Sequence, residues 1–169
     1  MPTSIFVWPA NRPVLGKRNR TLNLAIHCTA TREGQDISAA TVDKWHRDQK
    51  WAGIGYHYLI RLDGSIEAGR PEDTVGSGIA GHNAETVHIV YAGGLDNNLK
   101  PKDTRTPDQK AAMALLVRHL DAKYRFKKIG GHRDYSPDKN GNGTIERNEW
   151  LKDCPCFDVT GWLKAEGIR

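Results

Sequence analysis

A twelve-residue segment near the C-terminus has the residue types and spacing of a calcium-binding loop. In residues 138–149, oxygen-bearing side chains stand at positions 1, 3, 5 and 12 and glycine stands at position 6, as such loops require. The expected ligands are the side chains of Asp138, Asn140, Asn142 and Glu149, the backbone carbonyl of Thr144, and Glu146 either directly or through water. Pro137 leaves no room for a long entering helix, so we expect an isolated loop. The alternative interpretation is a solvated Asn/Gly turn.

A second possible metal site flanks this loop. His132 precedes the loop and Cys154 follows it. Together with one further histidine they would form an open three-ligand zinc site, which leaves a position for water. His27 is the best candidate, because it ends an apolar run as His132 does, and ligands commonly converge at strand ends. Spacing alone is weak evidence for this set, and Cys156 is an alternative third ligand.

The other histidines have simpler explanations. His46 and His119 fall in expected helices and are predicted to be exposed or half-buried, with no metal role. His88 lies in the middle of an expected strand and is predicted to be a core histidine. His57 follows Tyr56 on an expected strand, and because side chains alternate along a strand it should point to the opposite face. His57 is therefore predicted at most to support the site.

The hydrophobic pattern predicts strands and helices in alternation. Apolar runs and turn signals predict strands at residues 22–29, 56–62, 65–68, 86–92 and 128–131. Helices are predicted from the N-cap Ser38 to about residue 49, from Pro107 to about Tyr124, and near residues 159–165. The apolar stripe of the second helix is assigned to Ala111, Leu115, Val117, Leu120 and Tyr124. This order predicts an α/β fold, a single domain with a mixed central β-sheet flanked by helices.

Length, charge and cysteine content narrow the class of protein. The 169 residues suffice for one domain, which we assign to residues 22–169 after an irregular arm at residues 1–21. The net charge of +5 favours anionic partners, but no basic run singles out nucleic acid. An odd number of cysteines, three, favours a reduced cytosolic chain that uses a thiolate as a metal ligand. No segment approaches the ~20 apolar residues of a membrane span, and the first residues lack the apolar core of a signal peptide.

Several motifs occur in an order that resembles one enzyme family. They are IHCTAT, WHRDQKWAGIGYHYLIRLDGSIEAGRP, AGHN, VYAGG, GGHRD and KDCPCFDV. Through them residues 22–163 resemble the zinc-dependent N-acetylmuramoyl-L-alanine amidases of the phage-lysozyme and peptidoglycan-recognition type. In the short phage enzymes of that family the connection after the second histidine is brief, so the calcium loop at residues 138–149 is an insert here.

The resemblance implies a role for each matching residue. It implies zinc binding by His27, His132 and Cys154, catalysis by Tyr56 and Lys152, and a place in the substrate groove for His82. The reaction is hydrolysis of the amide between N-acetylmuramic acid and L-alanine, for which zinc activates a water and polarises the carbonyl. Lys152 would hold the oxyanion, and Tyr56 would orient the water or assist proton transfer. We expect calcium to order the turn that carries Lys152 and leads to Cys154.

The resemblance and the small size predict a peptidoglycan hydrolase of the phage endolysin type. We expect a monomer that stays in the cytoplasm of the infected host until a holin releases it to the periplasm and cell wall, without inserting into the membrane. Two alternatives remain open: an amidase that recycles muropeptides, and a protein that binds peptidoglycan without hydrolysis. A short phage relative also inhibits a phage RNA polymerase, so such a polymerase is a second candidate partner.

Overall fold

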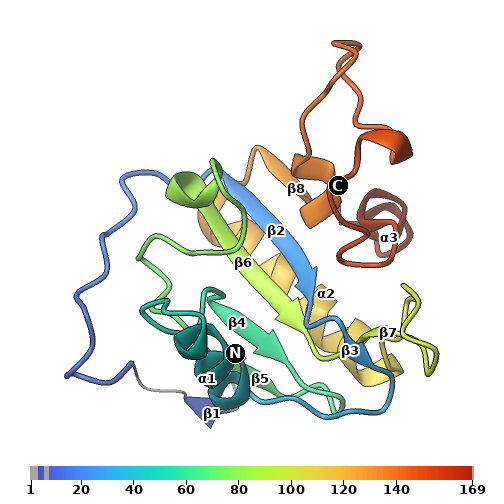
Figure 1. The fold of residues 1–169 in the computed structure, drawn as a ribbon. Helices are drawn as coiled ribbons and strands as arrows, with labels where there is room; N and C mark the ends of the chain where they lie inside the picture. Colours follow the sequence, from blue (N-terminus) through green and yellow to red (C-terminus); the bar gives the residue numbers. More distant parts are fainter. Residues whose placement is uncertain (1–3, 6–7, 169) are drawn as a thin grey trace.

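A six-stranded mixed sheet forms the centre of the molecule (Figure 1). The computed structural model describes residues 4–5 and 8–168; residues 1–3, 6–7 and 169 lie outside them, so the predicted arm at residues 1–21 is described only in part. The strand order is β1-β5-β4-β6-β2-β8, with β4 and β5 antiparallel and every other neighbouring pair parallel. The strands are β1 (Ser4–Ile5), β2 (Asn23–Cys28), β4 (Tyr58–Ile60), β5 (Ile66–Ala68), β6 (Thr86–Tyr91) and β8 (Lys128–Gly131). A second sheet pairs β3 (Thr31–Arg32) with β7 (Gly94–Leu95). The predicted fold class is confirmed.

The first two α-helices begin at side-chain caps. The α-helices are α1 (Ala39–Asp48), α2 (Pro107–Tyr124) and α3 (Val159–Ala165), and single 3-10 turns are η1 (Asn83–Glu85), η2 (His132–Tyr135) and η3 (Arg147–Glu149). Ser38 caps α1 by accepting the amide of Thr41, as predicted. Thr106, just ahead of α2, forms a capping box with Gln109 in the first turn of the helix, and proline stands at the first helical position. No helix of the described residues is long and apolar enough to cross a membrane.

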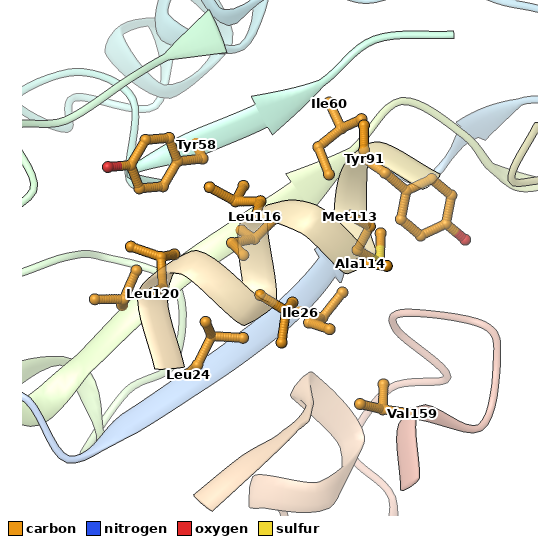
Figure 2. Packing of buried hydrophobic residues seen from close by; sticks show 14 of the residues in the cluster. Leu24, Ile26, Tyr58, Ile60, Tyr91, Met113, Ala114, Leu116, Leu120 and Val159 are labelled. Atoms are coloured by element: carbon orange, nitrogen blue, oxygen red, sulfur yellow. The ribbon is translucent and has the colours of Figure 1, made fainter. Parts of the chain in front are cut away.

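Helix α2 covers one face of the sheet with a different stripe from the predicted one. Its residues Met113, Leu116 and Leu120 pack on Leu24 and Ile26 of β2 (Figure 2). The predicted stripe was wrong at Ala111 and Leu115, which are exposed, Leu115 by 68%. Apolar residues are so dense in this helix that several phases fit the sequence, and the sheet selects the one with fewest gaps. The buried residues of α2 are Gln109, Ala112, Met113, Ala114, Leu116, Val117 and Leu120.

Strand β2 separates the hydrophobic core from the opposite face of the sheet. Leu24, Ile26 and Cys28 lie in the cluster under α2, so Cys28 faces the core as predicted. Ala25 and His27 alternate with them and point to the other face. Helix α1 packs on that second face, where it buries Val42 against Leu59 and Val90. The face that carries α1 therefore also carries His27.

Candidate functional site

Three predicted metal ligands meet at the end of β2. Strand β8 pairs with β2 so that Gly131 lies opposite Ile26, which places His132 beside His27. Cys154 arrives from the segment before α3. The two Nδ1 atoms of His27 and His132 are 3.2 Å apart, and Cys154 Sγ is 3.8 Å from His27 Nδ1. All three potential ligand atoms lie within 4.8 Å of one another.

The spacing and chemistry of these three donors fit zinc. Zinc binds nitrogen at about 2.0–2.1 Å and thiolate at about 2.3 Å, so tetrahedral geometry separates two nitrogens by about 3.3 Å and nitrogen from sulfur by about 3.6 Å. The separations of 3.2 and 3.8 Å are close to these values. The backbone N–H of Cys28 points at Cys154 Sγ from 3.4 Å and would stabilise a thiolate there. Two imidazoles and one thiolate are a ligand set typical of zinc.

Both imidazoles are neutral at pH 7, so each ring offers a lone pair on one of its nitrogens. Burial lowers the pKa of His27 well below its ordinary value, and the nearby charges of His132 and Lys152 act in the same direction. Burial also lowers the pKa of His132, to about 4, and the charge of Lys152 adds to this effect. A metal ion therefore does not have to displace a proton from either ring at pH 7.

Backbone hydrogen bonds hold Cys154 in place and set it apart from Cys156. The carbonyl of Cys154 accepts the amide of Arg133 at 2.9 Å, and the Tyr91 hydroxyl donates to the carbonyl of Pro155 at 2.7 Å. Cys156 Sγ instead lies 3.7 Å from Cys28 Sγ, beside the core. Of the two cysteines, only Cys154 joins the group formed with the two histidines.

Tyr56 lies against the candidate site, although not from a strand. Strand β4 begins two residues later, at Tyr58. The Tyr56 ring is centred 5.0 Å from the His27 ring and 5.4 Å from the His46 ring. Burial raises the pKa of the Tyr56 phenol, so it stays protonated and able to donate a hydrogen bond.

His46 differs from its prediction, because only 9% of it is exposed. Its Nδ1 accepts the amide of Gly55 at 2.9 Å, and its ring packs on that of Trp51 with 4.5 Å between centroids. These contacts anchor the backbone just before Tyr56. The sequence places His46 on a helix, and the contact from the following loop buries it.

His57 also differs from its prediction, because it does not point away from the face that carries Tyr56. Tyr58 of β4 faces the core under α2 and Leu59 faces the α1 side, so regular alternation would put Tyr56 on the α2 side. Tyr56 precedes β4 and packs instead on the α1 side with Leu59. The His57 ring stacks on His88 with 5.7 Å between centroids, and its Nδ1 accepts the His88 amide at 2.9 Å. His88 is fully buried, as expected for a core histidine, but its Nδ1 lies 3.0 Å from His27 Nε2. Sequence reasoning missed this contact.

A groove of about 730 Å³ is lined by one of the three donors, His132. Its lining includes Trp51, Ile79, His82, His132 and Lys152. His82 is exposed on the groove wall, where its ring meets the Tyr135 ring edge-on at 5.3 Å. The exposed Lys152 side chain lies beside His132 at the same groove. The structure thus brings His82 and Lys152 to one concave surface with His132, as the site of a bound substrate requires.

In the segment at residues 138–149, carboxylate oxygens turn towards backbone amides. Asp138 accepts the amides of Gly141 and Gly143, both at 2.7 Å. Glu149 is 2% exposed and accepts three amides, those of Lys139, Asn140 and Glu146. The Glu146 amide contributes most to lowering the pKa of Glu149. Among the described residues, the acidic side chains of this loop do not form a close group like that of His27, His132 and Cys154.

The buried His46 predicts an acid-sensitive stability. Its pKa is lowered to about 4, chiefly by burial, whereas in the unfolded chain it is about 6.5. The unfolded state therefore binds the proton more tightly, and His46 contributes stability that is complete above about pH 6.5 and is lost as the pH falls towards about 4. Between about pH 6.5 and pH 4 the unfolding free energy of metal-free wild type, measured in urea, should fall by up to about 3 kcal/mol more than that of His46→Asn.

The matched control for this prediction is His119→Asn, at an exposed position of α2. It should follow the wild-type pH dependence. If wild type and His46→Asn show the same pH dependence of unfolding free energy, His46 is not the group responsible.

Comparisons with known proteins agree with this architecture. The sequence pattern of the family described as N-acetylmuramoyl-L-alanine amidase matches residues 17–145. The endolysin of Enterobacteria phage K11 is 34% identical over 149 residues, covering 88% of this chain and 89% of that protein. The solved structure of the N-acetylmuramoyl-L-alanine amidase LysC from Clostridium intestinale URNW has a TM-score of 0.76 at 26% identity and covers 100% of both chains. Bumblebee PGRP-SA shares the fold, with a TM-score of 0.71 at 19% identity over 97% of this chain and 95% of its own.

Proposed function

Since the chain belongs to the N-acetylmuramoyl-L-alanine amidase family and is a peptidoglycan hydrolase with amidase activity, we propose that its catalytic metal is zinc, bound by His27, His132 and Cys154. The observation that carries this proposal is the convergence of the three donors at separations suited to tetrahedral zinc. The low pKa values of both histidines add support, because neutral rings can bind metal without first losing a proton. Zinc bound there supplies an acidified water and polarises the scissile carbonyl.

The residues around the donors take distinct parts in the proposed reaction. The Lys152 ammonium lies on the groove beside His132, where it can donate to the carbonyl oxygen as negative charge develops on it. Tyr56 keeps its proton and lies against His27, so its O–H can orient the attacking water or assist proton transfer to the leaving amine. His82 on the groove wall contributes to substrate binding. In this proposal the groove orients the muropeptide with its lactyl amide beside His132.

We place the enzyme among the endolysins in its biological role. The K11 relative carries that name and aligns over most of both chains. The net charge of +5 suits an anionic cell wall. On this proposal the protein is made in the cytoplasm of the infected host and reaches the wall through a holin. Faster hydrolysis of intact sacculi than of soluble muropeptides supports this role, and the reverse preference favours the recycling of fragments.

The experiment that tests the zinc proposal is reconstitution of the metal-free enzyme. Chelator-treated protein is added to purified sacculi, and turbidity is followed before and after equimolar zinc is restored. Zinc should restore lysis, whereas calcium or magnesium alone should not. Full lysis by protein shown to be free of transition metals contradicts the proposal.

A second part of the proposal is that calcium binds residues 138–149 and steadies the turn that leads to Lys152. The twelve-residue pattern supports this part. The end of the loop is also tied to the zinc side of the molecule, because the Leu151 amide donates to Ser136 Oγ at 3.1 Å. The Arg133 guanidinium further lies 4.1 Å from the centre of the Trp150 ring. Through these contacts, calcium binding in the loop would also restrain the segment between His132 and Cys154.

Calcium should raise the thermal midpoint of the zinc-loaded protein, and Glu149→Gln should remove that rise. The substitution keeps an amide-accepting oxygen but takes away the charge of the twelfth loop position. Asn148→Ala, at an exposed neighbouring position that is not an expected ligand, is the control and should keep the calcium response. Thermal midpoints are compared in calcium buffered by a chelator and in excess calcium. If calcium does not change the thermal midpoint of wild type, this part of the proposal is wrong.

A further inference from the structure

We propose that His88 is a positioning residue that holds the zinc ligand His27 in the form that binds metal through Nδ1. The inference rests on the zinc site proposed above. His27 turns its Nδ1 towards His132 and Cys154, and its Nε2 lies 3.0 Å from Nδ1 of His88. Each nitrogen of the His27 ring therefore faces a different partner.

The sheet register brings His88 to this position. Strands β2 and β6 are parallel, with Ala25 opposite His88 and His27 opposite Val90. Side chains two residues apart on a strand share a face, so His88 lies diagonally across from His27 on the α1 side of the sheet. Neither histidine has any exposed surface. Water does not compete for the contact between the two rings.

The position of one proton follows from the use of His27 Nδ1 as a ligand. A neutral imidazole carries its proton on one nitrogen and offers a lone pair on the other. If His27 binds metal through Nδ1, its Nε2 carries the proton and donates it in a hydrogen bond to His88 Nδ1. Histidine ligands usually make this bond to a carboxylate, a backbone carbonyl or water, and the bond fixes both the tautomer and the ring orientation. Here a second imidazole accepts the bond.

Close packing on more than one side restrains the His88 ring. The ring of His57 stacks on it at an interplanar angle of 9°. The backbone at Gly76 and Gly78 also packs closely against the ring. A Cβ at Gly76 would lie 2.4 Å from His88 Cδ2, and one at Gly78 would lie 2.6 Å from Nδ1. Both positions therefore need glycine if the backbone is to pack this closely on the His88 ring.

The other nitrogen of His88 shows that packing alone does not account for the residue. His88 Nε2 is buried and has no hydrogen-bond partner among the described residues. With Nδ1 accepting from His27, this Nε2 carries a proton, and a buried donor without an acceptor is unfavourable. An apolar side chain of similar size would avoid that penalty. The imidazole offers in exchange an acceptor at Nδ1 for His27.

The test measures zinc affinity rather than lysis. Zinc is titrated against a chromophoric chelator with wild type, His88→Leu, His88→Asn and, as control, His119→Leu at an exposed position of α2. Loss of such a supporting hydrogen bond should weaken zinc binding of His88→Leu by roughly 10- to 100-fold. His88→Asn should recover most of the affinity, because its Oδ1 can take the place of Nδ1. The His119→Leu affinity should equal that of wild type.

A spectroscopic measurement on the unaltered protein decides the matter if His88→Leu does not fold. Nitrogen NMR of ring-labelled, zinc-loaded wild type should show His27 and His88 both protonated at Nε2, with His88 Nδ1 bare. Protonation of His88 Nδ1 overturns the inference, and so does an unchanged zinc affinity in folded His88→Leu. A wild type that binds no zinc contradicts both the proposed zinc site and this inference. The same titration distinguishes this outcome from the other two, in which wild type binds zinc.

Discussion

Cys154→Ala should lose zinc binding and reduce amidase activity to the level of the metal-free protein. The substitution leaves two imidazoles, of which only His132 is partly exposed, and no anionic ligand for the metal. Three protein ligands are the usual minimum for a catalytic zinc, and the thiolate is the only one here that carries charge. The measurement is bound zinc per protein after gel filtration, together with the rate of muropeptide hydrolysis.

Cys156→Ala is the matched control, because it removes the same side chain two positions along the chain. Cys156 Sγ contacts Cys28 Sγ rather than the histidines, so this variant should keep its zinc and its activity, with at most a small loss of stability. If Cys156→Ala loses zinc while Cys154→Ala retains it, the ligand set is wrong. Cys156 would then be the third ligand.

Lys152→Ala should lower kcat by roughly 100- to 1,000-fold while zinc affinity stays close to wild type. The lysine lies on the groove beside His132 but does not belong to the group of metal ligands. A donor that acts on charge developing in the transition state contributes to kcat more than to substrate binding. The measurement is kcat and KM on a soluble muropeptide, with bound zinc determined on the same samples.

Lys164→Ala removes an equal charge from α3, outside the groove lining, and serves as the control. It should leave kcat unchanged. A Lys152→Ala enzyme whose loss appears only in KM would make the lysine a substrate-binding group. An equal loss in both variants would point to the net charge of the protein instead of a local role.

The regular elements were the part of the fold that the sequence predicted best. The bounds of β8 and the start of α2 were predicted residue for residue, and the end of α2 was predicted at about Tyr124, because proline and a run of apolar residues mark the helix. The opposite orientations of His27 and Cys28 also followed, since β2 is regular over its whole length. The prediction that His57 and Tyr56 face opposite ways was wrong, because Tyr56 precedes β4 and does not follow strand alternation.

Contacts between segments that are distant along the chain could not be predicted from the sequence. The approach of His88 to His27 depends on the register of β6 against β2, and no local pattern encodes that register. The burial of His46 depends on the loop before Tyr56, which packs back on α1. The separate surroundings of Cys154 and Cys156 depend on how the chain turns between β8 and α3. These are tertiary features, and local propensity does not determine them.

The most direct test of the proposed zinc amidase is chemical identification of the ends that it creates in peptidoglycan. Purified sacculi are digested with zinc-loaded wild type and with Cys154→Ala, and the soluble products are analysed by mass spectrometry after labelling of free amines and reducing sugars. Wild type should release peptides with free L-alanine amino termini and leave glycan strands with intact lactyl groups and no new reducing ends. Cys154→Ala should release no such peptides. New reducing ends, cleavage inside the peptide, or equal release by Cys154→Ala would contradict the proposed zinc-dependent cleavage of the lactyl amide.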